Sequence, residues 1–269
     1  MLHPSRTSFC VAGLLLVAAL PICGCEGDPA AHSQGATGAA GAEGKNGSDA
    51  KPPDKAAAVK KTEFGKNVWL ETQGKNRRVI VGATVVLREG SYGLECLLCR
   101  KFTKEHESIL ATDADASVIH ATLLLAGAEP GAPARYDEEK REWFPPRGMR
   151  IKVLFQYEEK GKRHTVRAQE WVKNTRTKKA LEENWVFAGS QLFRDPDGKE
   201  KPAYGANSDG SYICIYNSQV AMLDLPISNP NKDPQAEGRE FQPFTERIPP
   251  EGTHVSVILV PEPEKPVKK

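Results

Sequence analysis

The sequence predicts an α+β domain, a mostly antiparallel β-sheet system with one main helix packed on it. Two observations lead to this prediction. Short segments rich in Val, Ile, Tyr, Phe and Trp recur between residues 67 and 260, and they indicate roughly eight to ten strands separated by Gly, Pro and Asn. One segment, 117–126, combines capping residues with an unbroken apolar run suited to a helix.

The expected strands cover residues 67–71, 78–87, 92–100, 149–158, 164–169, 185–193, 211–217, 219–225 and 253–260. Both alternating sets of side chains in 78–87 are apolar, which indicates a strand buried on both faces. The charged alternation of 149–158 and 164–169 favours a half-exposed antiparallel hairpin. Asn217-Ser218 suggests a hairpin or a bulge, and Gly189-Ser190 suggests a bulge or the border of a ligand pocket. Residues 131–148, rich in Pro, Gly and charge, are expected to form a loop.

The helix is expected at Ser117 to Ala126, with the sequence SVIHATLLLA. Asp113 or Asp115 can cap its first turn, where a carboxylate also suits the positive end of the helix dipole. Gly127 is placed to end it, and the prolines that follow prevent its continuation.

His106-Glu107-Ser108 places an imidazole, a carboxylate and a hydroxyl in a row, as a catalytic set would need. Neighbouring side chains of a strand face opposite ways, however, and Ser108 lacks a Gly-x-Ser-x-Gly elbow. His120 lies three and four residues before two leucines, on the apolar side of the helix, where a histidine is more often a core residue than a ligand. His106 and His120 remain the best candidates for a metal or catalytic pair.

Cys96-x-x-Cys99 falls in an expected strand, where positions three apart lie about 10 Å apart and face opposite ways. That spacing excludes a disulfide between the two and disfavours a shared metal, so small buried residues are the simpler interpretation. Cys214 could pair with Cys96 or Cys99, or all three thiols could be free.

Residues 1–24 are interpreted as a lipoprotein signal peptide, with Arg6 before a short apolar segment. Ile22-Cys23-Gly24-Cys25 resembles a bacterial lipobox, in which Cys25 would carry the lipid and anchor the protein to a membrane. Ordinary secretion is the alternative, and both place the protein outside the cytoplasm, facing the periplasm or the outer surface. Residues 25–61 are expected to be a disordered Gly/Ala-rich tether, 62–261 the folded domain, and 262–269 a disordered tail.

Several classes of function are disfavoured. The net charge of +2 gives no case for binding nucleic acid. The chain has no phosphate loop, HExxH motif or EF-hand loop, and its sequence leaves any cofactor unknown. Three hypotheses remain. The first is a membrane-anchored, non-catalytic binding or assembly domain with a possible partner protein in the cell envelope. The second is a metal or redox site around His106 and His120 with Glu107, Cys96 or Cys99. The third is a hydrolase using Ser108.

The chain resembles the YdjY-like family of uncharacterised bacterial proteins, from about residue 66 to residue 261. The resemblance lies in the HES element at 106–108, in an I-H-x-x-L-L-L-x-G helix at 119–127, and in further short motifs: Trp185 to Ser190, Asp209-Gly210, Asn217, Asp224 to Pro226, and Pro249 to Thr253. The resemblance implies no particular reaction.

Overall fold

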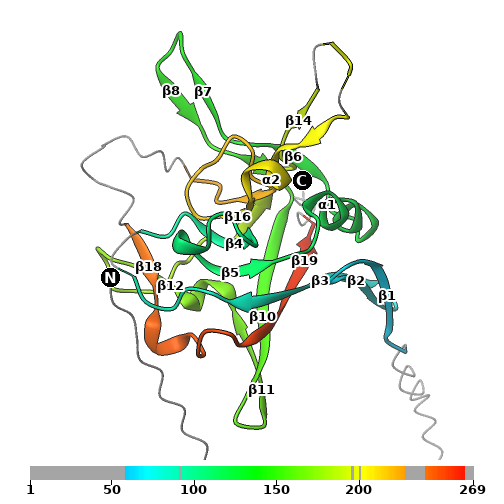
Figure 1. Ribbon diagram of the computed structural model, residues 1–269, viewed down its shortest axis with the longest axis vertical. Helices are drawn as coiled ribbons and strands as arrows, with labels where there is room; N and C mark the ends of the chain where they lie inside the picture. Colours follow the sequence, from blue (N-terminus) through cyan, green and yellow to red (C-terminus); the bar gives the residue numbers. More distant parts are fainter. Residues whose placement is uncertain (1–57, 91–92, 195–196, 200, 228–239, 264–269) are drawn as a thin grey trace, which may run out of the picture. The chain divides into compact units, whose positions relative to one another are not determined.

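The described part of the chain is built around a closed barrel of eight strands (Figure 1). The computed structural model describes residues 58–90, 93–194, 197–199, 201–227 and 240–263. Around the barrel the strands follow the order β3, β19, β10, β13, β17, β16, β4 and β5, and β5 pairs again with β3. Their bounds are β3 Asn76–Val85, β4 Cys96–Arg100, β5 Ser108–Thr112, β10 Arg150–Glu159, β13 Trp185–Phe187, β16 Ser211–Cys214, β17 Leu223–Asp224 and β19 His254–Glu262. The β4–β5 and β16–β17 pairs are parallel, and the other barrel pairs are antiparallel.

The predicted α+β class is wrong, because the structure is mostly β, with 47% of it in strands. Its described helices are α1, Ala116–Leu125, and the short α2, Gly205–Asp209. Closure explains the difference: the far end of β3 pairs with β5, Thr84 opposite Ala111 and Val85 opposite Leu110. The sheet therefore encloses its own core and does not depend on one covering helix.

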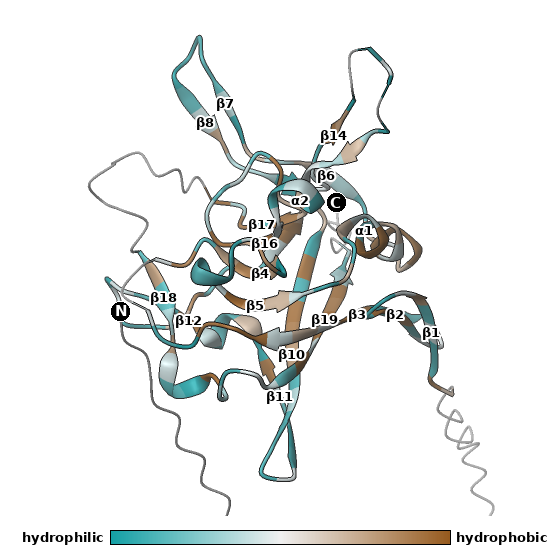
Figure 2. Ribbon diagram, in the orientation of Figure 1, coloured by the Kyte–Doolittle hydropathy of each residue, from teal (hydrophilic) through white to brown (hydrophobic). Residues whose placement is uncertain are grey.

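Alternate residues of β3, β19 and β10 point into the barrel and form this part of the core. Three rows run across these strands, and each row is buried: Val79, Leu259 and Val153; Val81, Val257 and Phe155; Ala83, Val255 and Tyr157. Because successive strand residues face opposite ways, the residues between them point out of the barrel. Figure 2 shows this concentration of apolar residues along the barrel strands, whereas the β7–β8 hairpin and the turn between β10 and β11 are mainly hydrophilic.

Further strands extend or decorate the barrel. β1 (Lys60–Gly65) and β2 (Val68–Gln73) continue the sheet beyond β3, and β11 (Lys162–Arg167) forms the expected antiparallel hairpin with β10. Smaller pairs are β12 (Val172–Asn174) with β18 (Phe241–Pro243), β14 (Leu192–Phe193) with β15 (Ala203–Tyr204), β6 (Pro130–Ala132) with β9 (Arg147–Gly148), and β7 (Arg135–Asp137) with β8 (Glu142–Phe144). Three 3₁₀ helices complete the described chain: η1 Glu105–Glu107, η2 Ala168–Trp171 and η3 Thr245–Arg247.

Two local predictions are wrong. The segment 131–148, expected to be a loop, supplies most of β6 and all of β7 to β9. These short paired strands bury few side chains, so their charged sequence lacks the apolar alternation by which a strand is predicted. The Asn217-Ser218 turn does not make a hairpin, because β16 and β17 pair in parallel through Ile213 and Leu223.

The predicted helix is confirmed. The Asp115 side chain caps α1 by accepting a hydrogen bond from the Ser117 N–H at 2.8 Å, and Gly127 follows its end with φ +93°. Neither helix in the described residues is long and apolar enough to cross a bilayer. The predicted signal peptide (1–24) and most of the predicted tether (to residue 57) lie outside the described residues.

Candidate functional site

The HES element lies at the junction of η1 and β5, where Ser108 is separated from the other two side chains by its burial. His106 is exposed, and its Nε2 lies 3.7 Å from Glu107 Oε2. Glu107 is half-buried beside Lys104 and Glu95; burial, followed by the Glu95 carboxyl, raises its pKa. Ser108 is fully buried and donates to the Leu110 carbonyl at 2.9 Å. The Ser108 hydroxyl is therefore closed to a substrate in this structure, and no histidine among the described residues forms a hydrogen bond with it.

His120 belongs to a different cluster, where α1 meets β13 and β15. The Tyr204 hydroxyl donates to the Gly189 carbonyl at 3.0 Å, so it accepts from His120 Nδ1, 2.8 Å away. The imidazole also meets the Phe187 ring edge-on, with centroids 4.8 Å apart. Burial lowers the pKa of His120. These contacts are those of a packed structural histidine, and none involves His106.

The three cysteines of the domain lie together, which the sequence did not predict for Cys96 and Cys99. Both pack with Cys214 and two alanines in one buried cluster, and the Cys96 and Cys214 Sγ atoms lie 3.7 Å apart. Burial raises the pKa of Cys99 to about 12. The predicted opposite orientation of Cys96 and Cys99 is wrong, because the β4–β16 register shifts by one residue on each side of Leu98.

Among the described residues, no three His, Cys, Asp or Glu side chains lie close enough together to hold a metal ion. The structure thus distributes the predicted candidates over three places: His106 with Glu107, His120 with Tyr204, and Cys96 with Cys99 and Cys214.

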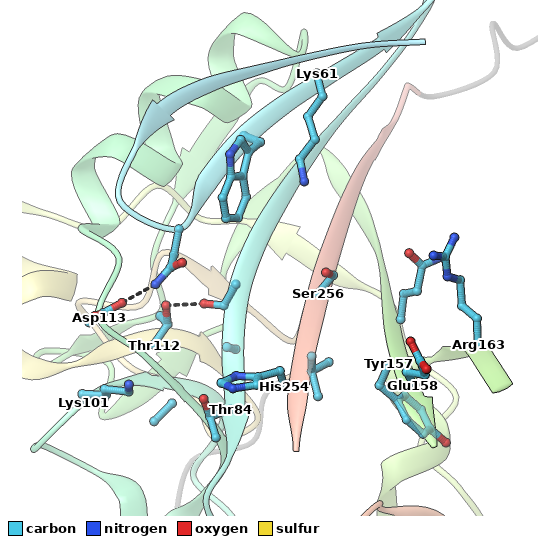
Figure 3. A pocket seen from close by; sticks show the side chains of 17 residues that line it. Lys61, Thr84, Lys101, Thr112, Asp113, Tyr157, Glu158, Arg163, His254 and Ser256 are labelled. Atoms are coloured by element: carbon cyan, nitrogen blue, oxygen red, sulfur yellow. Dashed lines mark hydrogen bonds between the residues drawn. The ribbon is translucent and has the colours of Figure 1, made fainter. Parts of the chain in front are cut away.

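The outer face of the barrel carries a groove, called here the β3–β19–β10 groove, with a volume of about 460 Å³ (Figure 3). Its floor consists of Gly82, Ser256 and Gln156, which are direct neighbours across the three strands. Ser256 has a small side chain, and the Asn67 side chain lies over Gly82, so that its amide forms part of the groove surface there.

Side chains from other elements form the walls of the groove. Trp69 comes from β2, and Lys61 Nζ of β1 lies 4.3 Å from the centre of its ring. Figure 3 shows Glu158 and Arg163 of the β10–β11 hairpin at one side and Lys101 and Asp113 at the other.

One rim is fixed by the turn between β1 and β2. Asn67 has a left-handed backbone, φ 59°, which asparagine tolerates better than most residues. Its carbonyl accepts the Gly82 N–H at 2.9 Å, and its Nδ2 donates to Asp113 at 2.5 Å. Lys66 pairs with the other Asp113 oxygen at 2.6 Å, and the hydrogen bond from Lys66, ahead of the one from Asn67, holds the Asp113 pKa below its usual value. The rim is therefore built and charge-neutralised before any ligand arrives.

Sequence reasoning missed the groove because its residues come from segments spread between Lys61 and Ser256. One signal was present. In both β3 and β19, residues that point out of the barrel next to the groove are small or polar. They are Gly82 and Thr84 on β3 and His254 and Ser256 on β19, and they become neighbours only when the two strands pair.

The closed barrel with its outer groove defines a β-barrel domain with an open surface site. A family model for the YdjY domain matches residues 70–260. The chain belongs to the YdjY domain family, as the motifs indicated. No curated protein and no solved structure matches it.

Proposed function

We propose that this YdjY-domain protein is an exported lipoprotein, held to a membrane through Cys25, whose barrel is a non-catalytic binding or assembly domain outside the cytoplasm. The lipobox-like Ile22-Cys23-Gly24-Cys25 and the Gly/Ala-rich tether support the anchor. Its partners are the bilayer and a component of the cell envelope, not nucleic acid.

The single observation that supports binding is the β3–β19–β10 groove. It is open, its rim is fixed by Asn67 and Asp113, and polar and charged side chains converge on it from several elements. A preformed concavity with a few converging polar groups is what a ligand site requires.

The anchor is tested by expressing the full chain with radiolabelled palmitate. The wild type should carry label and sediment with membranes, and Cys25→Ser should lose both, because the thiol that receives the lipid is gone. Cys23→Ser is the matched control and should behave as wild type. Label on Cys25→Ser, or an unlabelled soluble wild type, would refute the anchor.

Binding is tested with the full-length Cys25→Ser chain, which lacks the lipid attachment site, added to washed cell envelopes. It should sediment with them through the domain. Ser256→Trp places an indole on the groove floor and should reduce sedimentation at least fivefold, roughly the effect of losing one good contact. Equal sedimentation of both chains, or none, would contradict binding through the groove.

A further inference from the structure

We propose that the β3–β19–β10 groove binds an anionic saccharide, with a sugar ring on the groove floor beside Ser256 and its acidic group held by Lys101 or Arg163. This inference rests on the proposed function and gives its binding domain a class of ligand.

The shape of the groove fits a sugar unit of a longer chain. A volume of about 460 Å³ lies within the ~300–1,000 Å³ typical of small-ligand sites. Ser256 and Gln156 form the open part of the floor, the Asn67 side chain lies over Gly82, and Trp69 also lines the groove. Trp69 can offer an apolar surface to the C–H face of a pyranose once Lys61, whose Nζ lies 4.3 Å from the centre of its ring, turns away toward the acidic group. The open groove lets the saccharide chain continue.

Hydroxyl recognition comes from the same strands. The hydroxyls of Thr84 and Ser256 line the groove and bond to no other residue in the described part of the chain. Gln156 uses its Nε2 on Thr165, at 3.2 Å, so its Oε1 is left to accept from a ligand. These donors and acceptors come from three neighbouring strands and line the same groove.

The charge of the groove favours an acid. Lys61, Lys101 and Arg163 line it, and none of them forms an ion pair with a described carboxylate. Of the two acids, Asp113 is already paired with Lys66 at 2.6 Å. Only Glu158 opposes the three cations, and it is free to accept from sugar hydroxyls. Positive charge in a concave site attracts an anionic ligand.

An acidic peptide is less suited to this face. Extended peptides usually bind by adding a strand to a free sheet edge, where backbone N–H and C=O groups are available. Here β3 pairs with β2 and β19, and β10 pairs with β19 and β11, so the floor strands offer no such edge along the groove. Recognition must come from side chains, which suits hydroxyls and a carboxylate.

The test uses the purified full chain and titration calorimetry at low ionic strength. A trisaccharide of galacturonic acid should bind, and a neutral galactose trisaccharide should bind at least about tenfold more weakly, because the charge-assisted hydrogen bond is missing. Lys101→Ala and Arg163→Ala should each weaken binding of the acid about tenfold. Lys162→Ala removes an exposed cation next to Arg163 but outside the groove, and it should bind as wild type.

The proposal is overturned if the acid does not bind, if the neutral sugar binds as tightly, or if Lys162→Ala weakens binding as much as Arg163→Ala. Equal binding of a hexaglutamate peptide would also overturn the saccharide class. Should any of these occur while Ser256→Trp still blocks envelope sedimentation, the ligand class is wrong and the proposed function stands. If the sugar binds but the chain does not sediment with envelopes, the ligand class stands and the proposed function is wrong.

Discussion

Replacing Asp224 by Asn is expected to remove a large pH dependence from the stability of the domain. Asp224 lies in β17 and is fully buried. Its carboxyl accepts from the backbone N–H groups of Ser218 and Leu225, at 3.1 and 2.8 Å, and from Asn217 Nδ2 at 3.3 Å. Burial raises the pKa of Asp224 to about 7, and these three donors oppose the rise.

The sign and size of the effect follow from proton linkage. An unfolded Asp has a pKa of about 3.9, so between pH 4 and 7 the folded protein keeps a proton that the unfolded chain has released. The free energy of unfolding therefore falls as pH rises through this window. At about 1.4 kcal/mol for each pKa unit, the loss attributable to Asp224 is about 4 kcal/mol.

Urea denaturation between about pH 4.5 and 8 measures this loss. Asp224→Asn cannot titrate, so its stability relative to wild type should increase by several kcal/mol across the range, whatever the offset at low pH. Glu246→Gln changes an exposed carboxyl and should run parallel to wild type. If the free energy of unfolding of Asp224→Asn changed with pH in parallel with that of wild type, or fell relative to it at high pH, the three hydrogen-bond donors would outweigh burial.

Two further perturbations test the packed clusters. His120→Ala should cost about 2–4 kcal/mol in urea, because it leaves a cavity against Phe187 and leaves Tyr204 without a donor, and an unchanged midpoint would contradict this packing. Refolding in oxidised glutathione, which accepts the two hydrogens, should join Cys96 to Cys214, since they are direct partners with Sγ atoms 3.7 Å apart. Closing a loop of this length stabilises by up to about 5 kcal/mol. A different bond in the peptide mass map, or none, would contradict the prediction.

The elements that the sequence predicted well are those set by short-range physics. The α1 cap at Asp115, its end at Gly127 and the β10–β11 hairpin depend on residues within a few positions of one another. The closure of the barrel does not. It depends on Thr84 and Val85 meeting Ala111 and Leu110, and no local pattern in either strand states which partner it will take. The groove was missed for the same reason, because its floor exists only after β3, β19 and β10 are in register.

Strand β4 shows how a partner strand can overrule a sequence pattern. Strict alternation would place Cys96 and Cys99 on opposite faces and would keep them from sharing a site. Tyr212 is an extra residue on β16 and Leu97 is an extra residue on β4. The register between the two strands therefore shifts by one residue and then returns. Leu97 and Leu98 consequently both enter the main core, and the two cysteines turn together to the other side with Cys214. The spacing of Cys96 and Cys99 on β4 therefore does not determine whether they lie together. The register between β4 and β16 determines it, so the cysteine cluster depends on both strands.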